Sequence, residues 1–269
     1  LGDVYKRQVC YTGFQNSSHF HNTSNRRSLL LLVFGGALLL RLLLAYTTHG
    51  FSNDIACFAA WADRIFTLGP GQFYSAEMFT DYPPGFMYVL YLIGALRSLL
   101  QIPYYSDLHI LLLKSPAILC DIACGFLLYR EAVKRLHFSD LQGIFAASAY
   151  LFQPAVILNS SCWGQVDSVY TLMIILMCLF LMKGNLLPAY AVYGLGVLLK
   201  PQMLIFTPVL LAGIWDHVFL QDFSWRKFFY NLCGGLVVIC GMLLLCAPFG
   251  LTAAISQYTS TLGSYEYAA

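Results

Sequence analysis

Long apolar runs alternate with short polar segments through most of the chain. A helix that crosses the hydrocarbon core of a membrane needs about 20 apolar residues, and several runs approach or reach that length. They are residues 28–46, 108–129, 141–158, 166–182, 186–199, 202–219 and 228–248. None of these runs alternates apolar and polar residues with the period of two that is typical of a membrane β-barrel strand. The pattern therefore predicts an all-α fold, a polytopic transmembrane helical bundle of about seven spanning helices.

The distribution of positive charge indicates which loops lie on the cytoplasmic side, where Lys and Arg collect. Arg26 and Arg27 precede the first span and place the N-terminus inside. The next loop, residues 47–83, carries several acidic residues against a single Arg64, which predicts an outside location. The loop 130–140 carries Lys134 and two arginines and is expected inside. The chain must then cross the membrane an odd number of times between residues 84 and 129.

One more apolar segment, residues 84–100, lies in this interval beside a predicted span. It is short, begins with a double proline and carries Arg97, so we expect it to be a lying or re-entrant helix. The alternative is that it crosses the membrane, which would place the basic loop outside. If residues 84–100 do not cross the membrane, the outer face contains the loop 47–83 together with three further polar segments, near residues 159–167, 200–202 and 251–269.

Composition excludes a water-soluble fold. The chain is 59% hydrophobic and only 10% charged, whereas soluble domains carry about 25% charged residues. The net charge of +2 gives no indication of a nucleic-acid partner. The nine cysteines show no metal-ligand spacing, and most lie in apolar runs, where cysteine acts as a small hydrophobe.

The two ends of the chain need separate treatment. Residues 1–8 (LGDVYKRQ) resemble translated sequencing-adapter sequence, so they are excluded from reasoning about the fold. Residues 9–27 are then a cytoplasmic tail, and residues 28–269 form the membrane-embedded module. Because the chain stops at Ala269 within a polar, Tyr-rich stretch, we expect the C-terminal part of that module to be missing.

The outside loop begins with a short amphipathic segment. Ser52 or Asn53 can cap a helix that starts at Asp54. At 100° per residue, Asp54 and Trp61 lie on one face of this helix and Asp63 lies on the opposite face. The pattern indicates a carboxylate beside an aromatic platform at the membrane surface. The alternative is an amphipathic surface helix whose acids are simply solvated, and this is the favoured interpretation for Asp63.

Asp81 and Tyr82 end the same loop, directly before two prolines. Two prolines fix the direction of the chain into the next helix and remove backbone donors that its first turn would leave unpaired. On its own, this motif indicates the start of a helix with an acidic cap.

Lys114 and Asp121 lie inside the predicted span 108–129. An ionisable residue within a span costs at least about 2.5 kcal/mol and usually faces a cavity or a partner. The two residues are seven positions apart, on one face but too far apart to pair directly, and Pro116 opens the backbone between them. Lys114 is therefore a candidate cation for a phosphate at the outer mouth. The alternative is a lysine that snorkels to the interface.

Two polar turns interrupt the apolar runs further along the chain. In the first, Trp163 can stack on a sugar ring, while Gln165 and Asp167 offer groups that bind hydroxyls. The alternative is an interfacial loop with a tryptophan of the aromatic belt. In the second, Lys200 and Gln202 flank a proline at the end of a short apolar helix. A broken helix of this kind often marks an intramembrane site.

Taken in order, these residues resemble the GT-C superfamily of membrane glycosyltransferases. An acid in the first outside loop, a downstream tryptophan and DYPP are similar to the dolichol-linked-oligosaccharide glucosyltransferases. Protein O-mannosyltransferases carry HPPL there and Arg-x-x-Pro-Ala in the next span, where this chain has Lys114-Ser115-Pro116-Ala117. The segment QPAVILNSSCWGQVDS followed by LLKPQ resembles bacterial members often described as mannosyltransferase-like.

One feature departs from the O-mannosyltransferase pattern. Where those enzymes carry an acidic pair in the first loop, this chain has a single acid, in Asn53-Asp54. This difference favours the glucosyltransferase-like arrangement with one base and puts a metal-dependent scheme in doubt. No metal ligand and no cofactor is predicted, although a divalent metal is left open.

The resemblance implies transfer of a hexose from a polyprenyl-phosphate sugar to an acceptor hydroxyl on the extracytoplasmic face of a bacterial plasma membrane, with inversion. The acceptor would be a glycan, a lipid or a protein, with membrane lipid as a further partner and no nucleic acid. Asp54 would be the catalytic base, and Lys114 and Lys200 would bind the donor phosphate. The residues expected to bind sugar or acceptor are Trp61, Asp81, Tyr82, Trp163, Gln165, Asp167 and Gln202.

Two other functions remain open from the sequence alone. A transporter or flippase of lipid-linked sugars would also explain intramembrane charges and broken helices, but it leaves the acidic loop ending in DYPP unexplained. A non-catalytic subunit of an envelope assembly is the third alternative.

Overall fold

The computed structural model describes residues 23–74, 79–221 and 223–264, and within these residues the secondary structure is helical, without strands. The all-α prediction is confirmed. The predicted adapter-derived segment 1–8, and most of the predicted cytoplasmic tail, lie outside the described residues.

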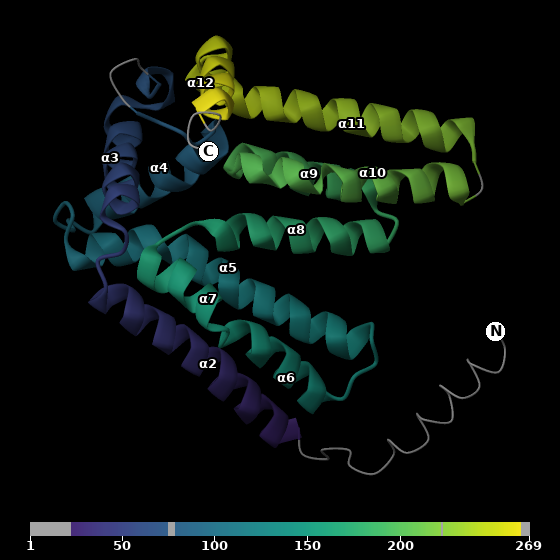
Figure 1. The fold of residues 1–269 in the computed structure, drawn as a ribbon, viewed down its shortest axis with the longest axis horizontal. Coiled ribbons are helices and arrows are strands. Elements are labelled where there is room, and N and C mark those ends of the chain that lie inside the picture. The colour runs from purple at the N-terminus through teal and green to yellow at the C-terminus, as the bar shows by residue number, and fades with distance from the viewer. Residues whose placement is uncertain (1–22, 75–78, 222, 265–269) are drawn as a thin grey trace.

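The predicted apolar runs all form helices that extend along the molecule (Figure 1). They are α2 (Thr23–Thr47), α5 (Asp107–Lys134), α6 (Asp140–Leu151), α8 (Asp167–Met182), α9 (Leu186–Leu199), α10 (Thr207–Trp215) and α11 (Trp225–Cys246). Two further helices, α3 (Ser52–Leu68) and α12 (Leu251–Ser264), run steeply across one end of this bundle. The end that α3 and α12 cover is called the α3 end below.

Length limits how many of these helices can span a membrane by themselves. In the described part of the chain, four helical segments are long and apolar enough: Asn25–Thr47, Asp107–Lys134, Pro201–Leu220 and Trp225–Phe249. A fifth is obtained if the bent pair Asp140–Leu151 and Pro154–Trp163 is one span. Helices α8 and α9 are apolar but have only 16 and 14 residues. At about 1.5 Å per residue, both are shorter than the ~30 Å hydrocarbon core.

The expected straight span 141–158 is in fact broken. Helix α6 ends at Leu151, and Pro154 begins the short helix α7 (Pro154–Ile157), with a bend of 52° between the two parts. Proline cannot continue the hydrogen bonding of the preceding helix. The side chain of Gln153 instead accepts a hydrogen bond from the backbone N–H of Val156 (2.8 Å), which caps α7.

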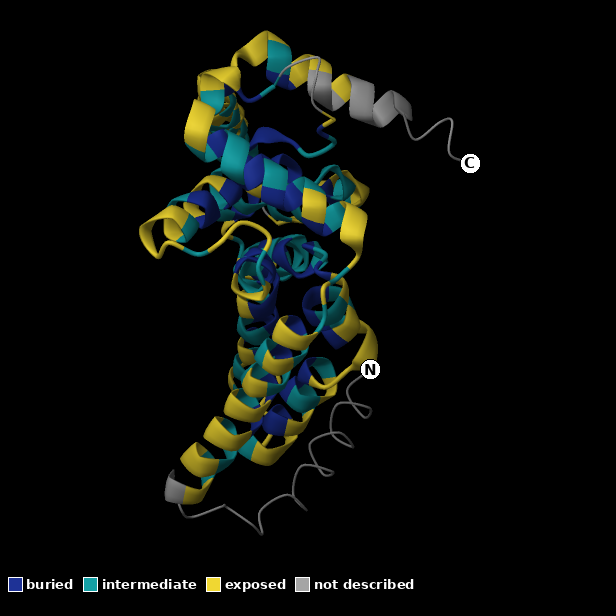
Figure 2. Ribbon diagram, turned by 90° about the vertical axis from the view of Figure 1, so that its left-hand side faces the viewer, coloured by how far each residue is buried: buried dark blue, intermediate teal, exposed yellow. Residues whose placement is uncertain are grey.

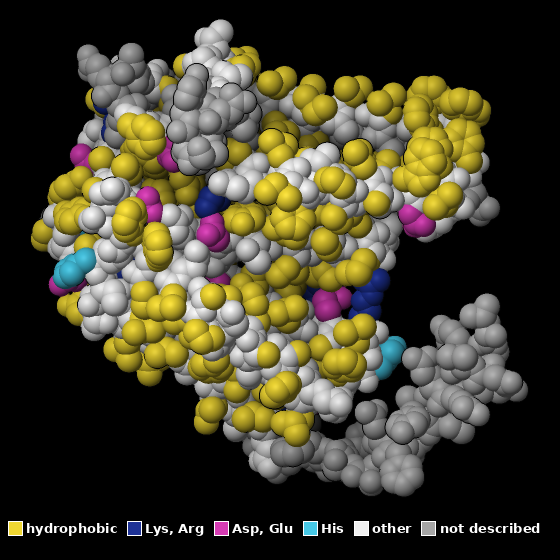
Figure 3. Space-filling view, in the orientation of Figure 1, with side chains coloured by type: hydrophobic (Ala, Val, Ile, Leu, Met, Phe, Trp, Pro, Cys, Tyr) yellow, Lys and Arg dark blue, Asp and Glu magenta, His cyan; other side chains and the backbone are white. Residues whose placement is uncertain are grey.

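Apolar side chains are spread over the face of the bundle seen in Figure 3, and Figure 2 shows long exposed stretches along the helices. Leu31 on α2, Phe145 on α6 and Leu244 on α11 are all more than 70% exposed. Such a surface is unfavourable in water but suits lipid, in which apolar side chains need no further burial. The exposed apolar surface and the helix lengths together indicate an integral membrane protein.

Helix α4 (Pro84–Leu99) packs against α3 at the α3 end. The contact is close because Gly94 has no side chain: a Cβ there would lie 2.5 Å from the carbonyl oxygen of Ala62. Asp63 and Arg97 form an ion pair across the same contact. Asp63 is therefore paired rather than simply solvated, and Arg97 has a partner in the segment 47–83. That α4 lies along the membrane surface stays a prediction.

The start of α3 differs from the expected one. The helix begins at Ser52 with Phe51 at the N-cap position, and neither Ser52 nor Asn53 caps it through a side chain. The backbone N–H of Phe51 donates a hydrogen bond to the carbonyl oxygen of Trp163 (2.9 Å). A contact from a distant segment thus fixes the entry into α3, in place of the local cap that the sequence suggested.

Basic side chains gather at the end of the bundle opposite α3. A hollow of about 420 Å³ there is lined by Arg130, Glu131, Lys134, Arg135 and Lys183. Four of these five residues come from the loop 130–140, which the charge pattern predicted to be cytoplasmic. The polar segments that were expected outside lie at the other end, as the next subsection describes.

Candidate active site

A polar cavity of about 450 Å³ opens at the α3 end of the bundle. Its walls come from α3, the loop before α4, the segment around residue 160, and the break between α9 and α10. The lining residues are Asp54, Asp81, Tyr82, Asn159, Trp163, Gln165, Asp167, Lys200, Pro201 and Gln202. Figure 3 shows acidic and basic side chains close together at this end of the molecule.

Asp54 is held at the cavity by two hydrogen-bond donors. Its Oδ2 accepts a hydrogen bond from Nε1 of Trp163 (3.2 Å) and another from Nε2 of Gln165. Among the described residues, both hydrogen bonds end on this one oxygen. The carboxylate is thereby oriented while Oδ1 keeps its capacity to accept a proton.

A wide helical turn, Leu158–Trp163, presents Trp163 and Gln165 to Asp54; it is called the π turn below. Gly164 ends it with φ +88°, in the left-handed region that favours glycine. The N–H groups of Gly164 and Gln165 both donate to the carbonyl oxygen of Asn159 (3.0 Å each). A Cβ at Gly164 would lie 2.6 Å from Cδ1 of Ile55 on α3. Glycine is thus required for the π turn to lie so close to α3.

Lys200 and Asp167 form an ion pair in the wall of the cavity. Nζ of Lys200 donates to Oδ1 of Asp167, and Nδ2 of Asn159 donates to Oδ2 (2.9 Å). Lys200 follows the last residue of α9, where Pro201 interrupts the helix. Its ammonium lies 5.9 Å from the centre of the Tyr82 ring. Lys200 is the cation that lines the cavity, against three carboxylates, so the cavity is acidic.

Three acceptor oxygens in the lining are buried without a hydrogen-bond partner among the described residues: Oδ1 of Asp81, Oδ1 of Asn159 and Oε1 of Gln202. The orientation of the Asn159 amide is fixed, because its nitrogen donates to Asp167. Buried acceptors without partners are uncommon and call for an explanation. A ligand rich in hydroxyl groups would supply the missing donors.

Burial also affects the ionisation of Asp81. It raises the pKa of this carboxyl group above its usual value, and the negative charge of Asp54 adds to the increase. A backbone hydrogen bond and the positive charge of Lys200 reduce the pKa shift without cancelling it. The neutral form of Asp81 is therefore favoured more than in a solvated aspartate.

Two of the predicted site residues do not line the cavity. Trp61 is only 2% exposed, and its Nε1 donates to the carbonyl oxygen of Phe79 (3.0 Å). Its ring packs against that of Tyr82 (5.7 Å between centroids), because the expected aromatic platform is covered by α4 and the loop before it. Trp61 therefore supports a cavity residue from behind.

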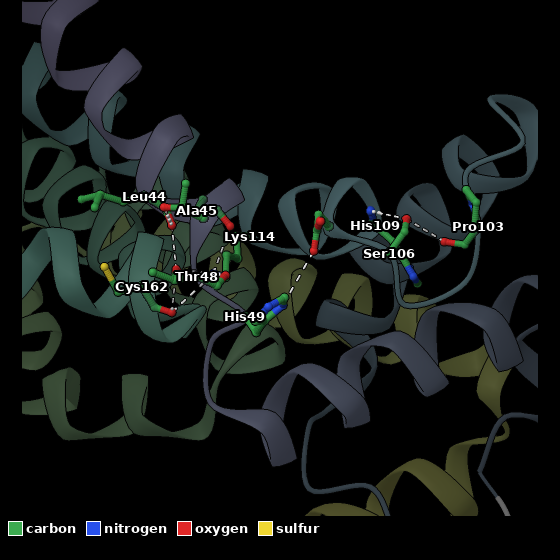
Figure 4. A network of polar contacts seen from close by, with 11 residues as sticks. Leu44, Ala45, Thr48, His49, Pro103, Ser106, His109, Lys114 and Cys162 are labelled. Carbon is green, nitrogen blue, oxygen red and sulfur yellow. Dashed lines mark hydrogen bonds and ion pairs between the residues drawn. The ribbon is translucent and has the colours of Figure 1, made fainter.

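Lys114 is the second such residue. Its side chain is fully buried and does not snorkel to a surface. Nζ donates to the carbonyl oxygens of Thr48 (2.7 Å), Ala45 (3.3 Å) and Cys162 (3.4 Å) (Figure 4). The ammonium group is thus surrounded by backbone acceptors behind the π turn.

Sequence reasoning missed Arg41, which proves to be the partner of Asp121. Nε of Arg41 lies 3.1 Å from Oδ2 of Asp121, and both side chains are fully buried. Arg41 could have been singled out from the sequence, since it is an ionisable residue inside the first predicted span. Asn159 was seen as the first residue of a polar turn, but its role as an amide on the cavity wall was not predicted.

The bundle and its polar cavity define an integral membrane protein with a site for a polar ligand at one end. A comparison with protein families finds that the profile of glycosyltransferase family 87 matches residues 79–267. Because this match covers more than half of the chain, the protein belongs to glycosyltransferase family 87. No curated protein matches the chain.

Family membership makes the protein a membrane glycosyltransferase, which confirms the resemblance at that level. It supports transfer chemistry, and nothing in the comparisons supports the transporter alternative. The matched region contains most of the cavity lining, from Asp81 to Gln202, but begins after Asp54. The role of Asp54 therefore rests on the geometry of the cavity.

Proposed function

We propose that the protein transfers a hexose from a polyprenyl-phosphate sugar to an acceptor hydroxyl at the extracytoplasmic face of the membrane, with inversion, and that Asp54 is the catalytic base. The observation that carries this proposal is the placement of Asp54. Its carboxylate lies at the polar cavity with one oxygen held by Trp163 and Gln165 and the other without a hydrogen bond in the described part of the chain.

The reaction requires one proton transfer and one substitution at carbon. The acceptor hydroxyl gives its proton to Oδ1 of Asp54, and its oxygen attacks the anomeric carbon of the donor sugar from the side opposite the phosphate. The new carbon–oxygen bond forms as the bond to the phosphate oxygen breaks, and the lipid phosphate leaves with the electron pair. Lys200 is the group suited to stabilise that departing charge, because it is the cation of the cavity lining.

The remaining lining residues suit an uncharged sugar. The unpartnered oxygens of Asp81, Asn159 and Gln202 can accept hydrogen bonds from sugar hydroxyls. The ring of Trp163 is about half exposed and gives a sugar an apolar face on which to stack.

The distribution of charge supports an extracytoplasmic site. The basic hollow that contains Arg130, Lys134 and Lys183 lies at the opposite end of the bundle from the cavity. Since cytoplasmic loops collect positive charge, the cavity is expected on the other side of the membrane. Lipid-linked sugars whose head groups face that side are then the accessible donors.

The test is sugar transfer in membranes with a panel of polyprenyl-phosphate sugars, comparing the wild type with Asp54→Asn. This change keeps the shape of the side chain and removes the basic oxygen. The loss of a general base typically lowers the rate by about 10²- to 10⁴-fold. Asp107→Asn is the matched control, because Asp107 is an exposed acid at the start of α5 and outside the cavity lining. Equal rates in Asp54→Asn and wild type would overturn the assignment of the base.

A further inference from the structure

Lys114 connects three segments that are far apart in sequence. Its Nζ contacts Ala45 and Thr48 at the end of α2 and the carbonyl oxygen of Cys162 in the π turn (Figure 4). The last carbonyl groups of a helix have no partner within the helix and carry the negative end of its dipole. The ammonium group, with its three donors, therefore satisfies acceptors that would otherwise be buried without partners.

The segment held by Lys114 leads directly to the site. Cys162 precedes Trp163, whose carbonyl oxygen accepts the backbone N–H of Phe51 at the start of α3 (2.9 Å). The hydroxyl group of Thr48 contacts both Lys114 (3.1 Å) and the carbonyl oxygen of Cys162 (3.4 Å). The end of α2, the π turn and the beginning of α3 are thus joined around one buried cation.

A second anchor lies two turns further along the same face of α5. Oδ2 of Asp121 accepts a hydrogen bond from Oγ of Ser160 in the π turn (2.6 Å), in addition to its ion pair with Arg41. Its Oδ1 accepts a hydrogen bond from the hydroxyl group of Tyr150 (3.2 Å). The π turn is therefore held by α5 at Ser160 and at Cys162, through two fully buried charged side chains.

We propose that Lys114 is a positioning residue for this reaction: together with Asp121 it fixes the π turn, so that Trp163 and Gln165 hold the Asp54 carboxylate in place. The inference rests on the proposed function of Asp54 as the base. Lys114 then aligns the base and does not bind the donor phosphate. Loss of this anchor should lower kcat and leave donor binding intact.

The first test uses Lys114→Met in the full chain, purified as folded protein. Two measurements are made: kinetics with the lipid donor, and hydrogen–deuterium exchange over residues 158–167. We expect kcat per folded molecule to fall by up to about 10²-fold, the effect of a misplacement of roughly 1 Å. The donor KM should stay within about threefold, because Lys200, Asp81 and Gln202 line the cavity from outside the π turn. The amides of Gly164 and Gln165 should exchange faster. Lys183→Met, at the opposite end of the bundle, is the control.

A pair of serine variants provides a second test that leaves no buried charge unpaired. The hydroxyl oxygen of Ser160 lies 3.1 Å from the carbonyl oxygen four residues earlier, and that of Ser148 lies 2.8 Å from the equivalent carbonyl oxygen. Only Ser160 also bonds Asp121. Ser160→Ala should therefore speed exchange in the π turn and lower kcat, by less than Lys114→Met does, whereas Ser148→Ala should change neither. If Lys114→Met fails to fold, this pair decides the question.

The outcomes separate the inference from the proposed function. A raised donor KM with unchanged exchange in Lys114→Met would overturn the positioning role and return Lys114 to the phosphate. Unchanged exchange and unchanged kcat in both Lys114→Met and Ser160→Ala would also overturn it. If instead Asp54→Asn stays active while Lys114→Met loosens the π turn and lowers kcat, the anchor stands and the assignment of the base fails.

Discussion

Two polar regions meet at the π turn, and they differ in how far their buried acceptor oxygens are hydrogen-bonded. In the cavity, buried acceptors of Asp81, Asn159 and Gln202 have no partners within the described residues. Behind the turn, Asp121 accepts hydrogen bonds on both carboxylate oxygens, and Lys114 is surrounded by backbone carbonyls. The two regions are called the open cavity and the closed anchor below.

Charged residues inside the membrane have different roles in the two regions. A charged residue within a span indicates function or a partner, and the position of the residue alone does not tell which. The closed anchor uses its charges for stability, since a buried ion is tolerated only when it is paired and hydrogen-bonded. The open cavity keeps unsatisfied acceptors, whose cost is recovered when a ligand binds. Among the described residues, the anchor has one buried donor without a partner, Nη2 of Arg41, whereas the cavity has three buried acceptors without partners. The unpartnered acceptors, which can bind a ligand that carries hydroxyl groups, therefore separate the two roles.

The largest expected effect tests the closed anchor. Asp121→Asn removes the charge that compensates Arg41, and both side chains are fully buried. Removing one partner of a buried ion pair typically costs about 3–5 kcal/mol. We therefore expect a large loss of thermal stability in detergent, measured by the midpoint of unfolding.

Asp63→Asn is the comparison variant, because it also breaks an ion pair, with Arg97, but at a partly exposed site. Exposed pairs contribute about 0–1 kcal/mol, so the midpoint should change little. Similar losses in the two variants would mean that the anchor is no more important for stability than the surface of the loop.

Much of the fold could be predicted from the sequence, because hydrophobic periodicity and loop charge reflect the membrane directly. The helical class follows from the apolar runs, and the separation of basic loops from the polar segments follows from their charges. The start of α3 at Phe51 could not be predicted, because it depends on a contact with a distant segment. The bend at Pro154 has a local cause, because proline interrupts the helix there.

The site could be predicted in part for a related reason. Residues such as Asp167 and Lys200 interrupt apolar runs and therefore stand out in the sequence, and they do line the cavity. Trp61 and Lys114 stand out equally, yet neither lines it. Whether such a side chain faces the cavity or packs behind it depends on how the helices pack against one another. That packing cannot be deduced from the sequence pattern of one helix.

A smaller effect is expected from the lysine of the open cavity. Lys200→Met should raise the donor KM and lower kcat/KM by about 10- to 100-fold, because a hydrogen bond to a charged group is worth about 1.5–3 kcal/mol. Loss of Lys200 should affect both donor KM and kcat, because the lysine is proposed to contact the phosphate before and during its departure, whereas Lys114→Met should lower kcat with little change in donor KM. Steady-state kinetics with the lipid donor provide the measurement.

The ion pair between Lys200 and Asp167 allows a sharper version of this test. If Lys200 serves only to neutralise Asp167, the double variant Lys200→Met/Asp167→Asn should recover donor use. If Lys200 contacts the donor phosphate, the double variant stays impaired. Recovery would move Lys200 into the same class as Lys114.

The smallest effect concerns Asp81, and it should act on stability and activity in opposite directions. Burial raises the pKa of this carboxyl group, so the folded state favours its neutral form. The stabilisation from the neutral form is fully present below the usual carboxyl pKa of 3.8 and is lost as the pH rises through the raised value. Asp81→Asn, which is always neutral, should therefore unfold at a slightly higher temperature than the wild type at pH 7.

That stability difference should vanish as the pH falls towards 3.8, where Asp81 of the wild type is protonated as well. Asp81→Asn should also raise the donor KM by a few-fold, because a sugar hydroxyl then donates to a neutral acceptor in place of a charged one. A more stable but less active protein is the expected signature of an open cavity residue. Equal unfolding temperatures for Asp81→Asn and wild type from pH 4 to pH 8 would show that leaving this acceptor unpartnered costs the fold nothing.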